Sequence, residues 1–498
     1  MTTFTHEFTS GPFVGKVDFP TGLYINGKFV DSAKKGRIDV INPTNGKKTM
    51  SISEATEEDV DLAVKAARNA FETVWGLHTP GYERGRLLYK LAQLMREHAP
   101  ELIALEMLDN GKSAMLAGLE IDQAISVVEY YAGWADKVQG SVIETTEANL
   151  AYTRREPLGV VCAIIPWNFP LSQVTWKLGP ALCTGNAFIL KPSEVSPVCP
   201  LRLASLIHEA GFPPGVVNVL AGYGITAGRA MTEHMDVDKI AFTGSTLTGR
   251  RVMEAAARTN LKKVSLELGG KSPNIIYDDC DLEQAVRWSI MGLYAGQGQL
   301  CAALTRIYVQ ESLYDKFVEA FLAGVKHMKI GGPFDPEAVV GPVVSQTQYD
   351  RVMSYIEAGK SQGASLLVGG TRHGNEGFFI QPTLFGGADE DAKIVKEEIF
   401  GPVGVVTRFK DEDDVVAKAN DTVYGLASAV FSKDIDRAIR TGHRLQAGTV
   451  WVNCVHGLHP QVPFGGYKQS GIGRELGEDA IHSYCNVKAM HVNLGIKL

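Results

Sequence analysis

The sequence predicts an α/β protein built from two doubly wound parallel sheets, each covered by helices on both faces. Four short segments are apolar on both strand faces and are separated by helical periodicity: residues 160–165, 187–190, 216–220 and 240–242. Such runs are typical of buried parallel strands. A second alternation of the same kind covers residues 272–474. The chain of 498 residues also exceeds the usual size of one hydrophobic core.

Before the first sheet, the sequence predicts a hairpin and a layer of helices. Two short apolar runs in residues 23–30 flank Asn26-Gly27, a pair that readily adopts the positive φ angles of a tight turn. The stretch 56–59, Thr-Glu-Glu-Asp, is typical of a helix start, and helical spacing of apolar residues continues to Gly133. Residues 139–155 alternate between polar and apolar, which indicates short strands outside the parallel sheets.

Composition and charge argue against several classes of partner. The net charge is −7, from 49 basic and 56 acidic residues without a polybasic run, so neither nucleic acid nor an anionic membrane is expected as the main partner. No apolar run reaches the ~18 residues of a membrane span. The seven cysteines lack the paired spacing of a metal site. We therefore expect reduced thiols, no metal and a cytoplasmic protein without a cleaved leader.

The chemistry is expected to centre on Cys301, which lies in a stretch of small residues and amides. A cysteine attacks a carbonyl as the thiolate, so a catalytic thiol needs hydrogen-bond donors or positive charge nearby. Gly296 and Gly298 let other backbone approach closely, and Gln297 and Gln299 carry amide donors. Taken alone, however, the segment is more typical of a buried structural cysteine.

Glu267 strengthens the catalytic interpretation. It stands between apolar residues at the end of a predicted strand, just before Gly269-Gly270. Burial there raises the pKa of a carboxyl group toward neutrality, which suits a general base that activates water. A thiol and such a carboxylate together suggest covalent catalysis followed by hydrolysis.

Over nearly its whole length the sequence resembles the NAD(P)-dependent aldehyde dehydrogenases, in particular the general, fungal-type, hydrolytic members. Besides the segments around Glu267 and Cys301, four motifs occur in the order of that family: Pro166-Trp167-Asn168-Phe169-Pro170, Phe242-Thr243-Gly244-Ser245-Thr246, Glu397-Glu398-Ile399-Phe400-Gly401-Pro402 and Pro463-Phe464-Gly465-Gly466. The resemblance implies an aldehyde dehydrogenase-like fold that oxidises an aldehyde to a carboxylic acid. Cys301 would form a thiohemiacetal and then a thioester, Asn168 would bind the oxyanion, and Glu267 would activate water.

The resemblance also implies a division of the chain and an assembly. Residues 1–138 and 158–269 would form the dinucleotide-binding domain, and residues 270–480 the catalytic domain. Residues 139–157 and 481–498 would form a β element that bridges subunits of a homodimer or a dimer of dimers.

The cofactor is expected at a strand-to-helix turn of the first sheet. Gly244, Ser245, Thr246 and Gly249 follow the strand 240–242 and open a helix, and helix starts bind phosphate through free N–H groups. By resemblance, Lys191 and Glu194 bind the adenosine ribose. A carboxylate repels a 2′-phosphate, so Glu194 favours NAD over NADP. The remaining contacts are also implied by motif position: Ile165, Trp167, Gly224, Gln348, Glu398 and Phe400.

A substrate pocket with polar groups is expected beside the thiol. In a helix, Phe169, Gln173 and Trp176 lie at i, i+4 and i+7 on one face. The other expected lining residues are Leu300, Ala302, His456, Leu458 and Phe464. They predict a tunnel with aromatic walls for a mid-sized aromatic or oxygenated aldehyde. In the alternative interpretation, Ser172 faces solvent and both His456 and His459 are surface residues.

Two other functional classes remain open at this point. A cysteine hydrolase would share the thiol and the oxyanion donors but normally needs a nearby histidine base, and neither core motif contains one. A non-catalytic aldehyde-binding protein of the same fold would be expected to lack Cys301 or Glu267, and both are present.

Overall fold

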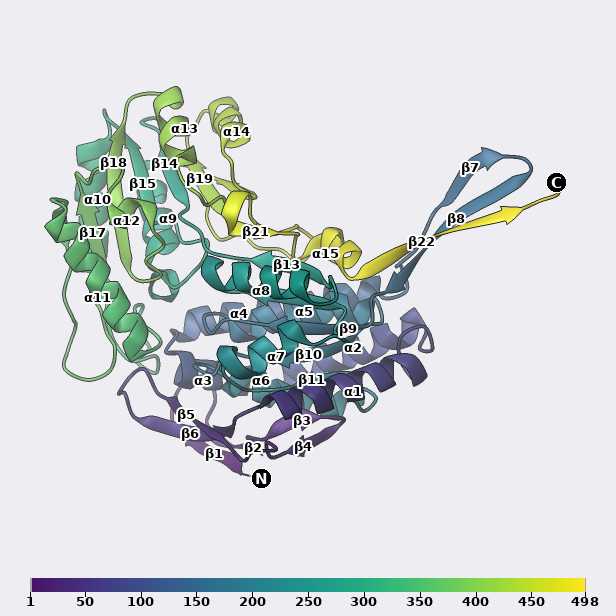
Figure 1. Cartoon of the computed structure of the whole chain (residues 1–498). Helices are drawn as coiled ribbons and strands as arrows, with labels where there is room; N and C mark the ends of the chain where they lie inside the picture. Colours follow the sequence, from purple (N-terminus) through teal and green to yellow (C-terminus); the bar gives the residue numbers. More distant parts are fainter. Residues whose placement is uncertain (1, 498) are drawn as a thin grey trace.

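The computed structural model describes residues 2–497 and contains both predicted sheets (Figure 1). The first sheet has the strand order β21-β13-β12-β9-β10-β11-β3-β4. Its strands are β3 (Leu23–Ile25), β4 (Lys28–Val30), β9 (Val160–Ile164), β10 (Ala187–Lys191), β11 (Val217–Val219), β12 (Lys239–Thr243), β13 (Lys263–Glu267) and β21 (Gly471–Ile472). The expected hairpin is confirmed as β3 and β4, and Asn26 and Gly27 have φ angles of 51° and 75°.

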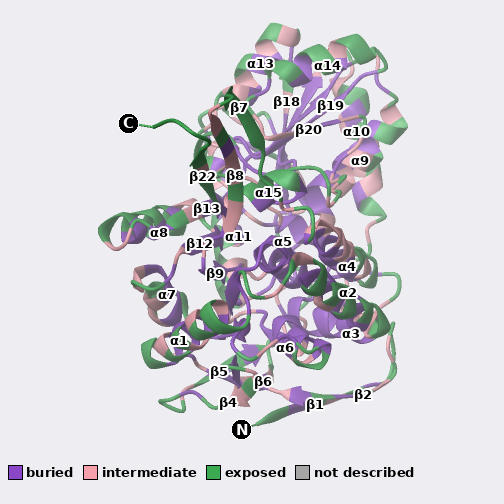
Figure 2. Cartoon of the chain, turned by 90° about the vertical axis from the view of Figure 1, so that its right-hand side faces the viewer, coloured by how far each residue is buried: buried purple, intermediate pink, exposed green. Residues whose placement is uncertain are grey.

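Helices cover both faces of this sheet because its strands bury alternate residues on opposite sides. On β9, Val161 and Ala163 pack in one hydrophobic cluster, and Val160, Cys162 and Ile164 pack in another. One face carries α2 (Gly81–Glu97), α3 (Ala99–Asn110), α4 (Ala114–Trp134), α5 (Pro170–Cys183) and α6 (Val198–Ala210), and the other carries α1 (Glu57–Thr73), α7 (Arg229–Glu233) and α8 (Thr246–Arg258). Figure 2 shows the buried residues along the strands and the inner helix faces.

The direction of winding reverses between β9 and β12. The chain adds β10 and β11 on one side of β9 and then β12 and β13 on the other. Ligands of doubly wound sheets bind at the carboxyl ends of the strands beside such a reversal. The segments that follow β9, β12 and β13 at this edge are the predicted motifs around Asn168, Gly244 and Glu267.

The second sheet has the order β16-β17-β18-β15-β14-β19-β20, with β16 antiparallel to its neighbour and the rest parallel. Its strands are β14 (Pro273–Ile276), β15 (Arg306–Gln310), β16 (Ser365–Val368), β17 (Thr383–Gly386), β18 (Val403–Phe409), β19 (Ala427–Phe431) and β20 (Thr449–Val452). Its helices are α9 (Leu282–Tyr294), α10 (Tyr314–Lys326), α11 (Gln346–Ser361), α12 (Lys393–Lys396), α13 (Glu412–Asn420) and α14 (Ile435–Arg444).

The predicted motifs of the second half lie at the opposite strand ends. Gly270 precedes β14, Cys301 precedes β15, and Glu398 and Phe400 precede β18. The first sheet therefore presents the carboxyl ends of its strands, and the second sheet the amino ends, to the space between them.

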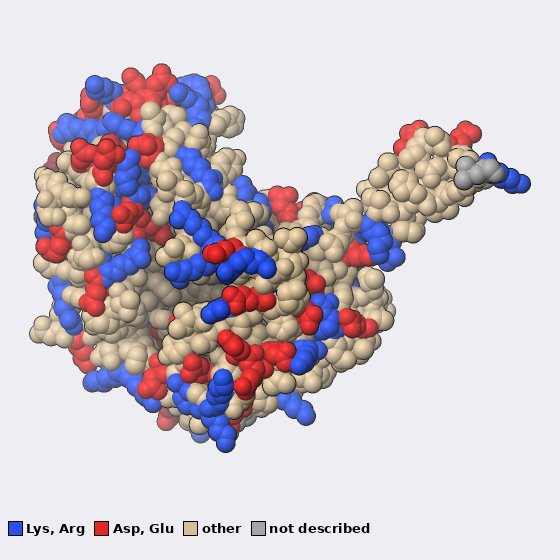
Figure 3. Space-filling model, viewed as in Figure 1, with Lys and Arg blue, Asp and Glu red and all other residues tan. Residues whose placement is uncertain are grey.

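Three further strands form an arm that projects from the body (Figure 1). The arm consists of β7 (Val142–Thr146), β8 (Asn149–Pro157) and β22 (Cys485–Asn493), which follows α15 (Gly477–Ser483). Val142, Ile143 and Val487 are 78%, 48% and 62% exposed on it, and much of its visible surface is uncharged (Figure 3). The remaining strand pairs are β1 (Thr3–Phe8) with β2 (Gly15–Pro20) and β5 (Arg37–Ile41) with β6 (Lys48–Ser53).

The expected helix start is confirmed, because α1 begins with a capping box formed by Thr56 and Asp59. All seven cysteines are free in the structure. Within residues 2–497, none of the helices combines the length and apolar character needed to cross a membrane.

Candidate active site

Two cavities meet between the sheets, where the surface is hollowed (Figure 3). The aromatic cavity, of ≈ 230 Å³, extends between α4, α5 and the loop before Phe464. The sheet-edge cavity, of ≈ 190 Å³, lies at the strand ends around Gly244. Three residues line both cavities: Asn168, Gln173 and Cys301. A group bound in one cavity would therefore meet a group bound in the other beside the Cys301 thiol.

The loop that carries Cys301 is held by backbone contacts. Residues 296–298 have φ angles of 56°, 58° and 68°, a left-handed run that glycine tolerates best. The Gln299 amide oxygen accepts a hydrogen bond from Val344 N at 3.0 Å. With its amide oriented to satisfy its neighbours, Gln297 donates to Gly296 O at 2.9 Å and accepts from Gly341 N at 2.8 Å. Both amides thus hydrogen-bond backbone groups and hold the loop.

The Cys301 thiol is partly exposed to the cavities but strongly desolvated. Burial raises its pKa to about 12, and the carboxyl groups of Glu398 and Glu267 raise it as well, whereas nearby backbone N–H groups lower it. The polypeptide alone therefore keeps the thiol protonated at neutral pH. The donors that a reactive thiol needs are here backbone N–H groups, and they do not offset the effect of burial.

Glu267 ends β13 and lines neither cavity itself, whereas the next residue, Leu268, lines the sheet-edge cavity. It is 4% exposed, and its Oε2 has no hydrogen-bond partner among the described residues. Burial and the neighbouring Glu475 raise the pKa of Glu267 well above its usual value, while Lys177 and Arg474 lower it. A Cβ at Gly465 would lie 2.8 Å from Glu267 Oε1, so glycine at this position gives the carboxyl group its space.

Lys177, in α5, makes three buried contacts that join α5 to the end of β12 and to the segment before α15. Its Nζ lies 2.6 Å from Glu475 Oε1 and donates to Thr243 Oγ1 at 2.7 Å and to Gln173 Oε1 at 3.0 Å. The three ammonium hydrogens are thereby all used. Glu475 was not among the predicted site residues, because a single carboxylate after Arg474 gives no sequence signal of its own.

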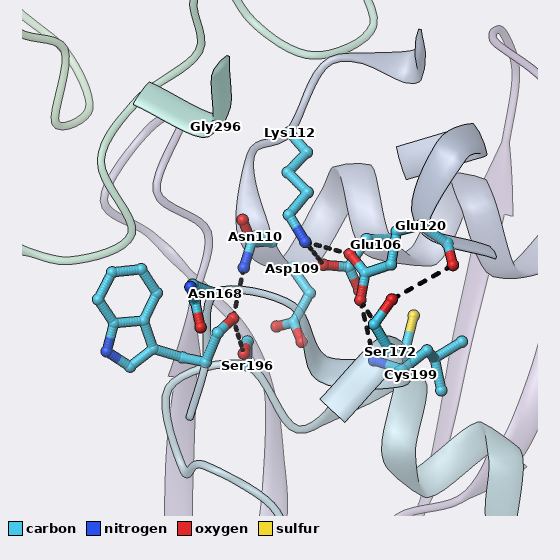
Figure 4. Close-up of polar contacts among 12 residues, drawn as sticks. Glu106, Asp109, Asn110, Lys112, Glu120, Asn168, Ser172, Ser196, Cys199 and Gly296 are labelled. Carbon is cyan, nitrogen blue, oxygen red and sulfur yellow. Dashed lines mark hydrogen bonds and ion pairs between the residues drawn. The ribbon is translucent and has the colours of Figure 1, made fainter. Parts of the chain in front are cut away.

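Asn168 follows β9 and points its amide toward the Cys301 loop. Its Nδ2 donates to Gln299 O at 2.8 Å, which uses one of two amide hydrogens. On the other side, the carbonyl of Trp167 accepts hydrogen bonds from Asn110 Nδ2 at 2.6 Å and Ser196 Oγ at 2.8 Å (Figure 4). The backbone just before Asn168 is therefore fixed by two donors.

Six of the predicted cofactor residues line the sheet-edge cavity: Trp167, Gly244, Ser245, Gln348, Glu398 and Phe400. Phe400 has a φ of 62° and makes an edge-on contact with Trp167, with ring centroids 5.3 Å apart. Positive φ at a bulky residue is costly and is typical of functional sites. Gln348 Nε2 donates to Phe400 O at 2.6 Å and supports this conformation.

The other predicted cofactor residues lie outside that cavity. Glu194 lines a separate groove with Tyr223. The ammonium of Lys191 is held by Pro192 O at 2.8 Å, Gly222 O at 2.7 Å and Glu194 Oε2 at 3.4 Å. A Cβ at Gly249 would meet Leu268 at 2.6 Å, so this glycine allows α8 to pack on the end of β13. The rest are Ile165, Thr246 and Gly224, where a Cβ would meet open space.

All eight residues expected in the substrate pocket line the aromatic cavity. The cavity also contains residues that sequence reasoning did not assign to it: Leu116, Leu119, Glu120, Gln123, Met291, Ala295 and Trp451. Ser172 is 1% exposed, so the alternative in which it faces solvent is wrong. His459 is exposed, but His456 lines the cavity, with Nε2 3.3 Å from Gly292 O. Burial lowers the pKa of His456 to about 4, so this ring is neutral.

Comparisons with known proteins agree with these features. A model of the aldehyde dehydrogenase family matches residues 29–490. An aldehyde dehydrogenase of Agaricus bisporus is 59% identical over 496 residues, which cover 99% of both chains. The NAD+ complex of a Bacillus cereus aldehyde dehydrogenase has a TM-score of 0.94 and 45% identity, covering 96% of this chain and 97% of the other. A Staphylococcus aureus betaine aldehyde dehydrogenase in complex with NAD+ has a TM-score of 0.95 and 42% identity, covering 96% of both chains.

Proposed function

The chain belongs to the aldehyde dehydrogenase family, and from this premise we propose that Cys301, Glu267 and Asn168 oxidise an aldehyde through a thioester. The observation that carries the proposal is the meeting of the two cavities at Cys301 and Asn168. A buried carboxyl group, Glu267, is close enough to raise the pKa of the thiol. This arrangement favours a redox enzyme over a hydrolase, which would not need a second cavity beside its nucleophile.

The residues of the sheet-edge cavity and its surroundings fit NAD. Ser245 Oγ caps α8 by accepting Thr248 N at 3.3 Å, and within residues 2–497 the amides of Thr246 and Leu247 have no acceptor. These amides and the helix dipole suit a pyrophosphate. Glu398 Oε1 accepts Gly270 N at 3.0 Å and suits a ribose hydroxyl. When bound, NAD+ supplies the hydride acceptor and a positive charge that favours the Cys301 thiolate.

In the first half of the reaction, the thiolate sulfur forms a bond to the aldehyde carbon. The carbonyl oxygen becomes an oxyanion and accepts hydrogen bonds from the free Nδ2 hydrogen of Asn168 and from the Cys301 N–H. Such donors contribute about 3 kcal/mol each to stabilising the transition state. The thiohemiacetal carbon then loses hydride, which leaves a thioester on Cys301.

In the second half, Glu267 takes a proton from the water that attacks the thioester. The Cys301 sulfur leaves as thiolate and the carboxylic acid is released. The high pKa of Glu267 makes its carboxylate a stronger base than an exposed glutamate. Lys177 opposes that rise, so the pair Lys177 and Glu475 adjusts the basicity of Glu267.

The overall activity can be tested by mixing the protein with NAD and simple aldehydes and following the absorbance of NADH. NADH and carboxylic acid are expected in equal amounts. Release of acid from a simple ester without NAD, with no NADH formed from the aldehyde, would favour the cysteine hydrolase. Binding of aldehyde without any product would favour the non-catalytic alternative.

We further propose that the substrate is a mid-sized aromatic or oxygenated aldehyde, because donors without partners line the aromatic cavity. The Lys177 ammonium can only donate hydrogen bonds, so Gln173 turns its Oε1 toward the ammonium and its Nε2 away from it. Ser172 Oγ donates to Gln123 Oε1 at 2.9 Å, which likewise leaves Gln123 Nε2 available. Trp176 lines the same cavity, but its Nε1 is buried. The two amide donors in an aromatic cavity suit oxygen acceptors on the substrate.

Gln173→Met is expected to lower kcat/KM for an oxygenated aldehyde by roughly tenfold or more and to spare aliphatic aldehydes of equal length. A lost buried hydrogen bond costs about 1–3 kcal/mol, and only the oxygenated substrate makes it. The measurement is kcat/KM for alkoxy or hydroxy aldehydes against matched alkanals. Leu300→Met, which changes the shape of the cavity without removing a donor, is the control. A uniform loss over both substrate classes would contradict the polar pocket.

Glu194→Ser is expected to narrow a preference for NAD over NADP. The Glu194 carboxylate, held by Lys191 at 3.4 Å, accepts hydrogen bonds from a diol but repels a 2′-phosphate. The measurement is kcat/KM for both cofactors at one aldehyde concentration, with Glu233→Ser as a control on a partly exposed carboxylate that is paired with Arg229. A wild-type preference for NADP would exclude this role.

We also propose that the arm bridges subunits of a homodimer or a dimer of dimers. Its exposed apolar residues, such as Val142 and Val487, form the kind of surface that protein partners cover. The proposed domain division remains 1–138 with 158–269, 270–480, and 139–157 with 481–498. Light scattering measures the mass of the assembly, and a comparison of the full chain with a Val142→Glu/Val487→Glu variant tests whether the arm bridges subunits.

A further inference from the structure

We propose that Lys112 is a positioning residue, which fixes the oxyanion donor Asn168 through the buried carboxylate of Glu120. The proposal rests on the function of Asn168 proposed above. Neither Lys112 nor Glu120 belongs to any of the sequence motifs that predicted the active site. Figure 4 shows both residues in a buried polar cluster beside Asn168.

The Lys112 ammonium is surrounded on all sides. It lies in the turn between α3 and α4, after Gly111 with a φ of 82°, and is 1% exposed. Its Nζ donates to Glu106 Oε1 at 2.9 Å and also to Glu120 Oε2. It lies 4.1 Å from the centre of the Phe169 ring, a cation–π distance. Lys112 therefore contacts the residue that directly follows Asn168.

Glu120 carries this contact to the backbone of α5. Its Oε1 accepts hydrogen bonds from Leu171 N at 3.0 Å and Ser172 N at 3.2 Å. Helix α5 has Phe169 at its N-cap and no cap from its own side chain. The first-turn N–H groups of a helix need acceptors and favour negative charge. Glu120, which belongs to α4, supplies both and caps α5 from outside.

Asn168 is consequently held from both directions by the same part of the fold. On one side, Asn110, the last residue of α3, and Ser196 donate hydrogen bonds to the carbonyl of Trp167. On the other side, Glu120 accepts hydrogen bonds from the amides of Leu171 and Ser172. Among the described residues, the Asn168 side chain makes a single hydrogen bond, to Gln299 O. Its placement thus depends on these flanking anchors.

The charge of Lys112 is what keeps Glu120 an effective cap. Three carboxyl groups, Glu106, Asp109 and Glu120, are buried around one ammonium. Burial raises the pKa of Glu120 to about 7 and that of Asp109 well above its usual value, and Lys112 opposes both shifts. Lys112 offsets part of the effect of burial, so its removal would raise the pKa of Glu120 further and shift this group toward the neutral form. A neutral carboxyl group accepts weaker hydrogen bonds from the two amides than a carboxylate does.

The principal test is a double-mutant cycle on the rate of the NADH burst in the full chain. Lys112→Met removes the charge and keeps much of the volume. We expect it to slow the burst by roughly 10- to 100-fold, because a displacement of about 1 Å has costs of this size. In an Asn168→Ala background, the same substitution is expected to have less than about a twofold effect, since residues that act through one group are not additive. Equal losses in both backgrounds would overturn the proposal.

A rescue variant separates positioning from general destabilisation. In Lys112→Met/Glu120→Gln, the amide oxygen of the new side chain still accepts the two α5 amides and needs no ammonium beside it. We expect the burst to recover by at least about threefold over Lys112→Met. A double variant as slow as Lys112→Met would count against capping through Glu120. This comparison still decides the question if Lys112→Met alone folds poorly.

Lys262→Met serves as the matched control. Lys262 is also a buried lysine, 6% exposed, whose Nζ donates to Thr232 O at 2.7 Å far along the chain from Asn168. It is expected to lower the melting temperature without slowing the burst. If the wild type gives no burst, or Asn168→Ala leaves it unchanged, the proposed function fails. If both behave as expected and Lys112→Met is additive, only the positioning role fails.

Discussion

Cys301→Ala is expected to abolish both the NADH burst and steady-state turnover, with a loss of roughly 10⁴-fold or more, since no other nucleophile replaces the thiol. Glu267→Gln is expected to keep the burst while turnover falls about 10²- to 10⁴-fold, the usual contribution of a general base. The difference arises because the thioester and NADH form before water is needed. Rapid-mixing measurements of NADH, followed by steady-state rates, distinguish the two variants.

The pH dependence provides a second check on Glu267. Burial raises the pKa of Glu267, and only the ionised carboxylate accepts a proton from water. Deacylation should therefore rise with pH through this raised pKa, and Glu267→Gln should flatten that rise. Glu478→Gln, on the surface of α15, is the control and should leave the profile unchanged.

Equal loss of the burst in Cys301→Ala and Glu267→Gln would mean that Glu267 is not chiefly the deacylation base.

Asn168→Ala is expected to slow the NADH burst by about 10²- to 10³-fold, the usual cost of one oxyanion donor. The amide stabilises charge that exists only in the tetrahedral state, so kcat should fall while the KM for NAD stays nearly constant. Single-turnover rates at saturating NAD measure the effect directly.

Asn168→Asp provides the matched comparison for this prediction. Aspartate has a similar shape, but a carboxylate would repel the oxyanion, so the loss should be at least as large as in Asn168→Ala. An Asn168→Asp variant with nearly wild-type burst rates would show that the side chain does not act as a hydrogen-bond donor.

Much of the fold follows from local patterns in the sequence. The strands β9, β10, β11 and β12 were predicted because fully buried parallel strands are apolar on both faces. Cys301 and Glu267 were singled out because a lone thiol and a lone carboxylate stand in segments rich in glycine and apolar residues. The family resemblance, which the comparisons confirm, then connected these segments into one enzyme.

The electrostatic state of the site was decided only by the tertiary structure. The sequence placed the amides of Gln297 and Gln299 near the thiol, and only the structure shows that they bind backbone groups and that burial raises the pKa of Cys301. The donors of the aromatic cavity depend on Lys177, which turns the Gln173 amide, and on Ser172, which turns Gln123.

The sequence by itself determined which segments form strands and helices and which of them carry the thiol and the carboxylate, because these features depend on residues within a few positions of one another. The tertiary structure decided what surrounds the thiol and the carboxylate, namely the two cavities and the ion pairs Lys177–Glu475 and Lys112–Glu120. Lys177 lies in α5 and Glu475 lies between β21 and α15, far apart in the sequence. Lys112 acts on Asn168 through Glu120 of α4, which caps α5. These ion pairs arise because helices and loops distant in the sequence pack around the first sheet, and the two cavities arise because the carboxyl ends of its strands face the amino ends of the second sheet. No local periodicity encodes either kind of packing.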